Sequence, residues 1–256
     1  MAQSIYITDD LVIPRGIVYF DPFNASGATT GEIDLGETGG STISPQTDSL
    51  TYFSSRSKLR QQIRDVPTSI ARTFALTIDN ISMFNLGMFL IADASVVTQT
   101  ATPVVGEPFT ALKGRTYQLG GLTPARNVTA VAVKVGVATK VLNTDYTLDA
   151  ANGRVTVLTA GSIADNDAMT VDYTPTAETR NRLISGTTPK IGALRIVSDA
   201  AEGKNKHIYM PKVIMKPSGE MPVIAADDAW QQMAFEVGIQ VKTGFAALYV
   251  DDQAIG

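Results

Sequence analysis

The sequence predicts a mainly β protein, in which a discontinuous domain is interrupted by a second, smaller β-domain. Two observations carry this prediction. The chain of 256 residues contains 29 Thr and 22 Val, and β-branched side chains favour strands because they are stiff and pack well on a pleated surface. Short segments of alternating apolar and polar residues recur along it. The length allows one large domain or two smaller ones, each able to bury a core.

Composition excludes several kinds of chemistry. The chain has no cysteine, which excludes disulfides, thiolate zinc sites, iron–sulfur clusters and cysteine nucleophiles. His207 is the one histidine, so a His-rich metal site is absent and a hydrolase with a histidine base is disfavoured. We therefore expect a protein that is not an enzyme and that uses no cofactor or metal.

The charge balance is mildly acidic. With 21 basic and 25 acidic residues, the net charge is −4 and the pI about 5.0, so the chain has no general attraction for nucleic acid or anionic membranes. Met1–Tyr6 lacks the pattern of a signal peptide. The longest apolar stretch, Met83–Ala92, is shorter than the roughly 18 residues of a membrane span. We expect maturation in the cytoplasm and no membrane partner.

The first part of the chain predicts strands on either side of a long loop. Leu11–Phe20 has a strand pattern, and Pro14 favours an edge or a bulge. Asn24–Thr47 is rich in Gly, Ser and Thr and predicts a flexible loop, of a length that is usually functional or ordered by a partner. The next predicted strands, the first two as a possible hairpin, are Ser49–Phe53, Lys58–Ile63 and Thr68–Ile78.

One short helix is predicted at about 79–91. Asp79 is a candidate N-cap, and the helix itself is expected over Asn80–Ile91. Apolar residues recur there with helical spacing, which predicts a stripe that packs on the core. They are Ile81, Phe84, Met88 and Ile91.

An inserted β-sandwich is predicted over residues 96–179, inside a host domain of residues 1–95 and 180–256. Polar spacers, Val96–Glu107 and Thr174–Lys190, flank a run of short strands, and Asn152-Gly153 favours a tight hairpin turn between two of them. Eight of nine Phe and seven of eight Met lie outside Val96–Glu178, which indicates a separate core, although one continuous sandwich stays possible. The strands are Tyr117–Leu119, Val128–Val137, Tyr146–Leu148, Val155–Val157 and Met169–Tyr173.

The sequence after the inserted domain, residues 191–250, predicts further strands of the host domain. Pro217-Ser218-Gly219 is expected to form the turn of a hairpin. Asp227–Phe235 could form a capped helix, but the alternation of apolar residues from Met233 to Ile239 is longer than one helical turn and favours a strand over Trp230–Val241. The other predicted strands are Ile191–Ser198, Tyr209–Met215, Met221–Ile224 and Gly244–Val250.

Four features could suggest chemistry, and each has a plainer interpretation. Gly36–Gly40 resembles a phosphate loop but lacks the Gly-Lys-Ser/Thr ending, so a surface loop is favoured. Asp165-Asn166-Asp167 lacks the spacing of a calcium loop and is typical of a turn. Asp227 and Asp228 would point to opposite faces of a strand, so a turn or loop is favoured over an acid–base pair. His207, between lysines and polar residues, predicts a solvated loop histidine.

The one notable basic run is Arg56, Lys58, Arg60 and Arg64. The first three would share one face of a strand. A solvated hairpin and an interface that meets acidic groups of a neighbouring subunit are equally favoured. A nucleic-acid site ranks third, because no aromatic residues interleave the charges.

Seven segments outside the inserted domain share an order along the chain with a known family. They are Gly31–Thr38, Asp48–Ser55, Thr77–Ile81, Asn85–Leu90, Gly192–Val197, Tyr209–Val213 and Lys216–Glu220. In this order they resemble the major tail protein, which is the tail tube subunit of long non-contractile phage tails. The last three segments are similar to the returning strands of that fold, and the segment from Asp145 to Thr174 looks like an Ig-like β-sandwich module of phage structural proteins.

The resemblance implies a structural virion protein with a tail-tube β-sandwich or barrel fold. Such subunits assemble in the host cytoplasm into hexameric rings that stack into a tube. The implied partners are other copies of the chain, the tape measure protein, the tail terminator and the distal tail or baseplate proteins. DNA passes through the lumen without specific binding, and an acidic lumen would let it slide.

If the resemblance holds, the loop length and the basic hairpin assign an inter-ring contact to the segment Gly36–Arg64. The inserted domain is expected to be a decoration that the tube does not need. The competing hypothesis is an adhesin or decoration protein that binds host-surface carbohydrate, although Tyr117, Tyr146 and Tyr173 are the only tyrosines of the small domain and it has no Trp. The proposed inter-ring contact residues are Gly36, Gly39, Gly40, Arg56, Lys58, Arg60 and Arg64.

Overall fold

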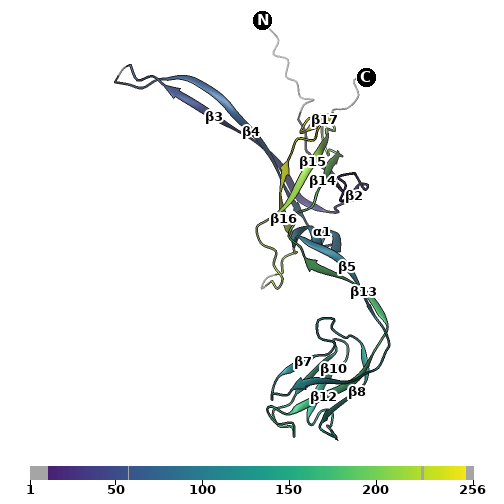
Figure 1. The fold of residues 1–256 in the computed structure, drawn as a ribbon. Coiled ribbons are helices and arrows are strands. Elements are labelled where there is room, and N and C mark those ends of the chain that lie inside the picture. The colour runs from purple at the N-terminus through teal and green to yellow at the C-terminus, as the bar shows by residue number, and fades with distance from the viewer. Residues whose placement is uncertain (1–10, 57, 226–227, 252–256) are drawn as a thin grey trace. The chain divides into compact units, whose positions relative to one another are not determined.

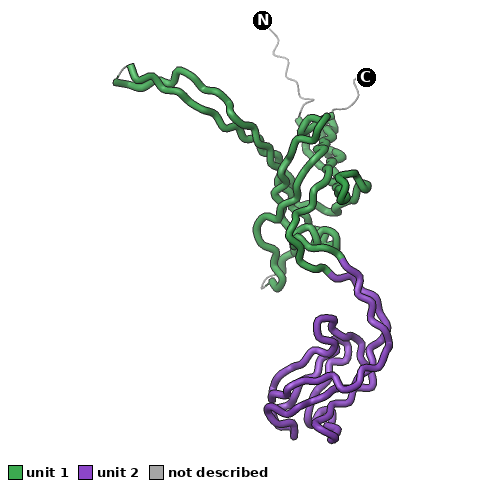
Figure 2. Tube along the Cα trace, viewed as in Figure 1, with its two compact units in different colours: residues 1–94, 183–256 green, residues 95–182 purple. Residues whose placement is uncertain are grey.

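The computed structural model describes residues 11–56, 58–225 and 228–251. The chain is 54% strand and 3% helix, which confirms a mainly β fold with one short helix. It divides into two compact units (Figure 2): unit 1 is Met1–Ala94 with Leu183–Gly256, and unit 2 is Ser95–Arg182. The predicted borders, after residues 95 and 179, fall within one and three residues of these.

Unit 1 is built on one antiparallel sheet with the strand order β2-β1-β14-β15-β16-β4-β3, and β17 pairs with β15 off this path (Figure 1). The strand predicted over Leu11–Phe20 begins only at Gly16, and Ile13 makes an isolated bridge to Glu202. The strands are β1 (Gly16–Pro22), β2 (Ile33–Asp34), β3 (Thr38–Phe53), β4 (Gln62–Ile78), β14 (Ile191–Ser198), β15 (His207–Ser218), β16 (Met233–Ile239) and β17 (Tyr249–Asp251).

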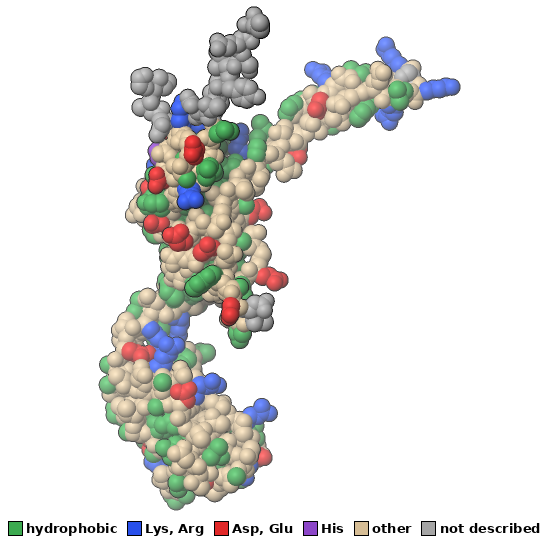
Figure 3. Space-filling view, turned by 180° about the vertical axis from the view of Figure 1, so that it is seen from behind, with side chains coloured by type: hydrophobic (Ala, Val, Ile, Leu, Met, Phe, Trp, Pro, Cys, Tyr) green, Lys and Arg blue, Asp and Glu red, His purple; other side chains and the backbone are tan. Residues whose placement is uncertain are grey.

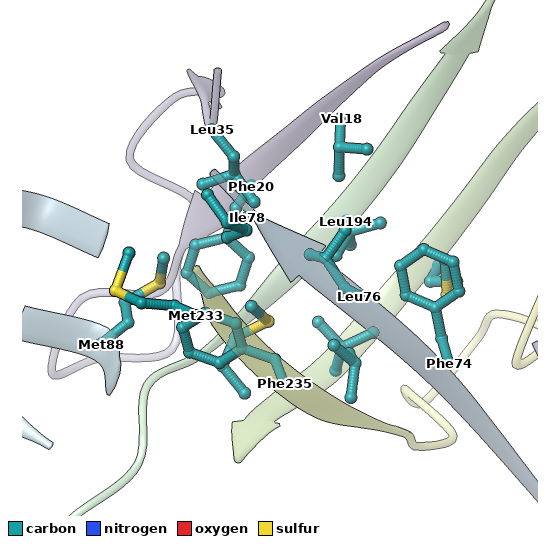
Figure 4. Close-up of a cluster of buried hydrophobic side chains, with 14 residues drawn as sticks. Val18, Phe20, Leu35, Phe74, Leu76, Ile78, Met88, Leu194, Met233 and Phe235 are labelled. Atoms are coloured by element: carbon teal, nitrogen blue, oxygen red, sulfur yellow. The ribbon is translucent and has the colours of Figure 1, made fainter. Parts of the chain in front are cut away.

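The core of unit 1 lies on one face of this sheet (Figure 4). Alternate residues of β4 point inward, so Phe74, Leu76 and Ile78 are buried while the residues between them are more exposed. Met233 and Phe235 of β16 join them in the same cluster. Burying one such side chain stabilises the fold by about 1.5–3 kcal/mol, so this short stretch of alternation anchors the sheet.

Helix α1 (Met83–Phe89) covers part of that core. Met88 is buried, and Ile81 and Phe84 pack against the cluster, as the predicted apolar stripe requires. The predicted N-cap Asp79 is wrong, because Ser82 caps the helix by accepting a hydrogen bond from Asn85 N at 3.1 Å. The helix also ends before Ile91, whose φ of +50° leaves the helical region.

The predicted flexible loop Asn24–Thr47 is wrong over much of its length. From Thr38 onward this segment belongs to β3, which pairs with β4 as far as Phe53 opposite Gln62. The hairpin strand expected at Lys58–Ile63 begins only at Gln62, because residues 54–61 form the connection. Pairing with β4 satisfies the main-chain donors and acceptors of this Thr- and Ser-rich segment. Its polar side chains do not predict this strand.

The predicted hairpin turn at Pro217–Gly219 is also wrong. β15 continues through Pro217 to Ser218, where Ser218 lies opposite Ala234 of β16. Met221–Ile224 therefore forms part of a longer connection and is not a strand. The alternating pattern of residues 233–239 does form a strand, as expected from its periodicity.

Unit 2 is a β-sandwich of a three-stranded sheet, β10-β11-β7, and a four-stranded sheet, β6-β12-β8-β9. Both sheets contribute to one core, for example Val155 from β11 and Val171 from β12. At Gly153 the chain has a φ of +62°, and a Cβ there would lie 2.0 Å from Ala125 O. The strands are β6 (Val104–Thr110), β7 (Thr116–Gln118), β8 (Val128–Val135), β9 (Ala138–Thr139), β10 (Tyr146–Asp149), β11 (Arg154–Val157) and β12 (Ala168–Pro175).

The predicted polar spacers are strands in the structure. β5 (Ala92–Gln99) and β13 (Glu178–Ser185) pair with each other in a two-stranded sheet, and β6 takes up the end of the first spacer. Gln99 of β5 donates to Thr176 O at 2.6 Å. The chain thus passes between the units twice, through two paired strands, which sequence periodicity did not reveal because most of their side chains are exposed or half-buried.

Candidate assembly surface

The hairpin of β3 and β4 continues far beyond the core of unit 1 (Figure 1). Phe74 lies opposite Ile43 at the last position where a β4 side chain is fully buried. Beyond this pair the ladder continues to Phe53 and Gln62, and nearly every side chain on it is exposed. An isolated two-stranded hairpin is only marginally stable in water, so this extension lacks the support that other strands of the sheet have.

Apolar side chains lie exposed on the extension. Leu50 is 70% exposed and lies opposite Val66, while Tyr52, 62% exposed, lies opposite Arg64. Residues two apart on a strand share a face, so Leu50, Tyr52 and Val66 form one apolar surface. Large exposed apolar surfaces mark sites of protein interaction.

The outer edge of β3 is unpaired over 16 residues, because β3 is the last strand of the sheet and pairs only with β4 among the described elements. A long unpaired edge presents main-chain donors and acceptors to other chains. Stable proteins usually cover or interrupt such an edge, so this one is suited to contact with a partner.

The four basic residues gather at the far end of the hairpin (Figure 3). Arg56, Lys58 and Arg60 lie in the connection between the strands, so the prediction that they share one face of a strand is wrong. The connection is closed by Ser54 N, which donates to Gln61 O at 2.8 Å. Arg64 lies on β4. No acidic residue occurs from Ser49 to Arg64, so this end, termed the hairpin tip (Ser54–Arg64), is strongly cationic.

The three glycines of the predicted contact lie elsewhere, along a groove of about 960 Å³ in unit 1. Its lining comes from two parts of the sheet. One part is β1, β14 and β15, and the other is the segment from Asp34 to Ile43 with Phe74 of β4. Gly36 has a φ of +79°, and a Cβ on it would lie 2.3 Å from Asn80 Nδ2. A side chain at this position would therefore be strained by its backbone and would clash with Asn80.

The structure thus separates the seven predicted contact residues into two sets. Gly36, Gly39 and Gly40 line the groove, and the four basic residues lie on or beside the hairpin tip. No pattern in the sequence predicts the groove, because its acidic lining residues Asp34 and Glu37 are ordinary exposed side chains. Only the curvature of the sheet brings them beside apolar side chains that are distant in the sequence.

The other candidates occupy structural positions. Asp167 accepts from Ala164 N at 2.8 Å within its own turn, and Asp165 accepts from Lys113 N at 2.7 Å, which joins two segments 52 residues apart. His207 is exposed and accepts from Ser198 N at 3.1 Å, but it begins strand β15 and so does not lie in a loop. Asp227 lies outside the described residues.

The described residues hold no group of three or more His, Asp or Glu side chains that could bind a metal. Within the same residues, no helix is long and apolar enough to cross a membrane.

Two of the three tyrosines of unit 2 are buried, Tyr146 and Tyr173. Burial, with a hydrogen bond to Glu107, raises the pKa of Tyr173 well above its usual value. The hydroxyl of Tyr117 donates to Thr110 O at 2.9 Å and its ring lies beside Phe109. The tyrosines of unit 2 therefore do not form an exposed aromatic platform.

Comparison with known proteins gives a family but no activity. None of the curated proteins matches the sequence. One family model covers the region from β1 through the strand β16, residues 11–243, which is most of the chain. The chain therefore belongs to the family described as protein of unknown function UCP028589.

Proposed function

We propose that this chain is a structural virion protein, the tail tube subunit of a long non-contractile phage tail. Copies assemble into hexameric rings, and the rings stack into a hollow tube through which DNA is delivered to the host cell. The other partners are the tape measure protein, the tail terminator and the distal tail or baseplate proteins. The sequence resemblance described above is the origin of this proposal.

The observation that carries it is the hairpin of β3 and β4. It exposes an apolar surface, a 16-residue strand edge and a cationic tip, and none of these is covered by the described part of the same chain. Repeated contact between copies would cover all three, and in a closed ring the strand edges are no longer available for aggregation. Self-assembly is the function that best explains why such a costly feature is kept.

Electron microscopy of the purified protein over a range of concentrations tests the proposal. We expect stacked rings or tubes at high concentration. Charge reversal at Arg56, Lys58 and Arg60 should leave soluble monomers, since these residues are assigned to the contact between rings. Deletion of Gly36–Gly40 would not test the contact alone, because Thr38–Gly40 belongs to β3 and its loss would also disturb the sheet. Monomers at every concentration would refute the proposal.

The lumen is expected to be acidic, so that DNA slides without specific binding. A reconstructed tube with a positive channel wall would contradict this part alone. The adhesin hypothesis loses its main candidate platform, since Tyr146 and Tyr173 are buried. Binding of the full chain to a carbohydrate on a glycan array would revive it.

A further inference from the structure

The predicted contact residues occupy two separate places in one molecule, and the hairpin keeps them apart. Ile43 lines the groove, and β3 continues for ten more residues to Phe53 before the hairpin tip begins. A strand rises by about 3.3 Å per residue, so the tip lies about 30 Å further along. β3 stays paired with β4 from Ile43 to Phe53, so the tip lies away from the groove of its own chain.

The groove has the chemistry to receive a cationic protein segment. Asp34 and Glu37 line it, with no cationic partner among the ion pairs of the described residues. Its lining includes the apolar residues Ile17, Ile43 and Ile196, of which Ile17 is 43% exposed. Ligand pockets usually span roughly 300–1,000 Å³, so about 960 Å³ has room for several side chains.

The groove is also lined by Arg15 and Lys206. An incoming hairpin also offers a partner for these, because Asp65 follows Arg64 on β4 and lies opposite Thr51. The tip itself has Arg56, Lys58 and Arg60 for Asp34 and Glu37, and the exposed Ile63 for the apolar surface. Both charge and apolar character are therefore matched between the tip and the groove.

We propose that the hairpin tip of one copy docks into this groove of a second copy of the chain. This inference rests on the proposed function and names the surface that receives the hairpin. The contact joins two different surfaces, so it is heterologous: each copy has one tip and one groove, and the contact repeats from one ring to the next along the tube. The three glycines and the four basic residues then belong to one contact, made by two chains.

A charge exchange tests the pairing. Arg56→Glu with Lys58→Glu makes the tip less cationic, and Asp34→Asn with Glu37→Lys makes the groove less acidic. The Asn at position 34 keeps an acceptor for Gly36 N, which donates to Asp34 at 2.8 Å. Each double variant should raise the concentration needed for assembly by about tenfold or more, because like charges then face each other. All four changes in one chain should restore most of the loss.

A matched control is Lys113→Glu with Arg115→Glu. These exposed residues of unit 2 have the same spacing and undergo the same charge change, and they should leave assembly unchanged. The proposal is overturned if either double variant assembles as the unmodified chain does, or if the fourfold variant is no better than the double variants.

Cross-linking separates this inference from the proposed function. Because the chain has no cysteine, Ser55→Cys in the tip and Ser41→Cys in the groove supply the only thiols. A mixture of the two single variants should give tip-to-groove disulfides well above those formed by either variant alone. Cross-links without tubes would refute the tail tube and keep the docking. Tubes without these cross-links would refute the docking alone.

Discussion

The side-chain amide of Asn85 donates a hydrogen bond to the main-chain oxygen of Leu35 across 2.9 Å. The same amide donates to Asn80 O, also at 2.9 Å. Leu35 is buried, and its N–H donates to Val18 O. One buried amide on α1 therefore fixes the segment that leads from β1 into the groove, which couples the helix to the shape of the candidate docking surface.

The first prediction concerns this amide. Asn85→Asp should destabilise unit 1 strongly, because a carboxylate would lie against two main-chain oxygens that it cannot pair with. Asn85→Ala should cost about 1–3 kcal/mol, since both carbonyl oxygens lose their partner. Urea unfolding followed by circular dichroism measures both changes. Asn181→Asp, at an exposed position of β13, is the control. Equal effects of Asn85→Asp and Asn181→Asp would disprove the role of the amide.

The second prediction concerns Gln99 in unit 2. Its amide nitrogen donates to Arg126 O and Thr176 O, and its oxygen accepts from Arg126 N at 3.0 Å. Gln99→Glu removes both donors and places a carboxylate against those two oxygens, so we expect faster hydrogen exchange around Arg126 and a lower unfolding temperature for unit 2. Gln118→Glu is not a suitable control because its amide also donates to main-chain oxygens. Gln240→Glu in unit 1 serves instead, and exchange around Arg126 should not respond to it.

The third prediction is a pH dependence of unit 2. Hydrogen bonds from Val141 N and Ser162 N, each 2.8 Å long, lower the pKa of Asp145 below its usual 3.8. Because the folded-state pKa is the lower one, this carboxylate stabilises the fold above about pH 4, and the contribution is lost as the pH falls through the folded-state pKa. The pKa of Asp172 is also lowered, most by a hydrogen bond from Lys134 and next by one from Gly106 N.

Thermal unfolding of the full chain between about pH 5 and pH 2 measures this effect. Asp145→Asn should lower the unfolding temperature of unit 2 at pH 5 and should make its decline toward pH 2 shallower than in the unmodified chain. Asp228→Asn, at an exposed position of unit 1, should leave that decline unaltered. An identical slope in the Asp145 variant would show that the two main-chain contacts do not stabilise the carboxylate.

The fourth prediction is that unit 2 is dispensable for the fold of unit 1. Residues 95–182 hold their own core, with Val155 and Val171 among its members. Joining Ala94 to Leu183 through a short glycine linker should therefore leave unit 1 folded, with cooperative urea unfolding and an intact strand signal in circular dichroism. The excised chain should also still assemble. An unfolded product would contradict the insertion, and a folded product that fails to assemble would contradict its role as a decoration.

The sequence by itself determined the mainly β class, the place of the helix and most strands of unit 2. These elements bury one face, so their apolar residues recur at the spacing of a helix or a strand. Phe74, Leu76 and Ile78 of β4 in unit 1 show the same spacing. The absence of cysteine and the single histidine were equally visible in the composition.

Only the tertiary structure decided the nature of the segments from Thr38 to Phe53 and from Ala92 to Gln99. Their strands are held by main-chain pairing to β4 and β13 while their side chains stay largely exposed. Because neither strand buries one face, the sequence shows no regular alternation of apolar residues there. The groove, too, depends on the tertiary structure. Asp34 and Lys206 line it together, although 171 residues separate them in the sequence, because a curved sheet brings strands together by pairing order and not by sequence order.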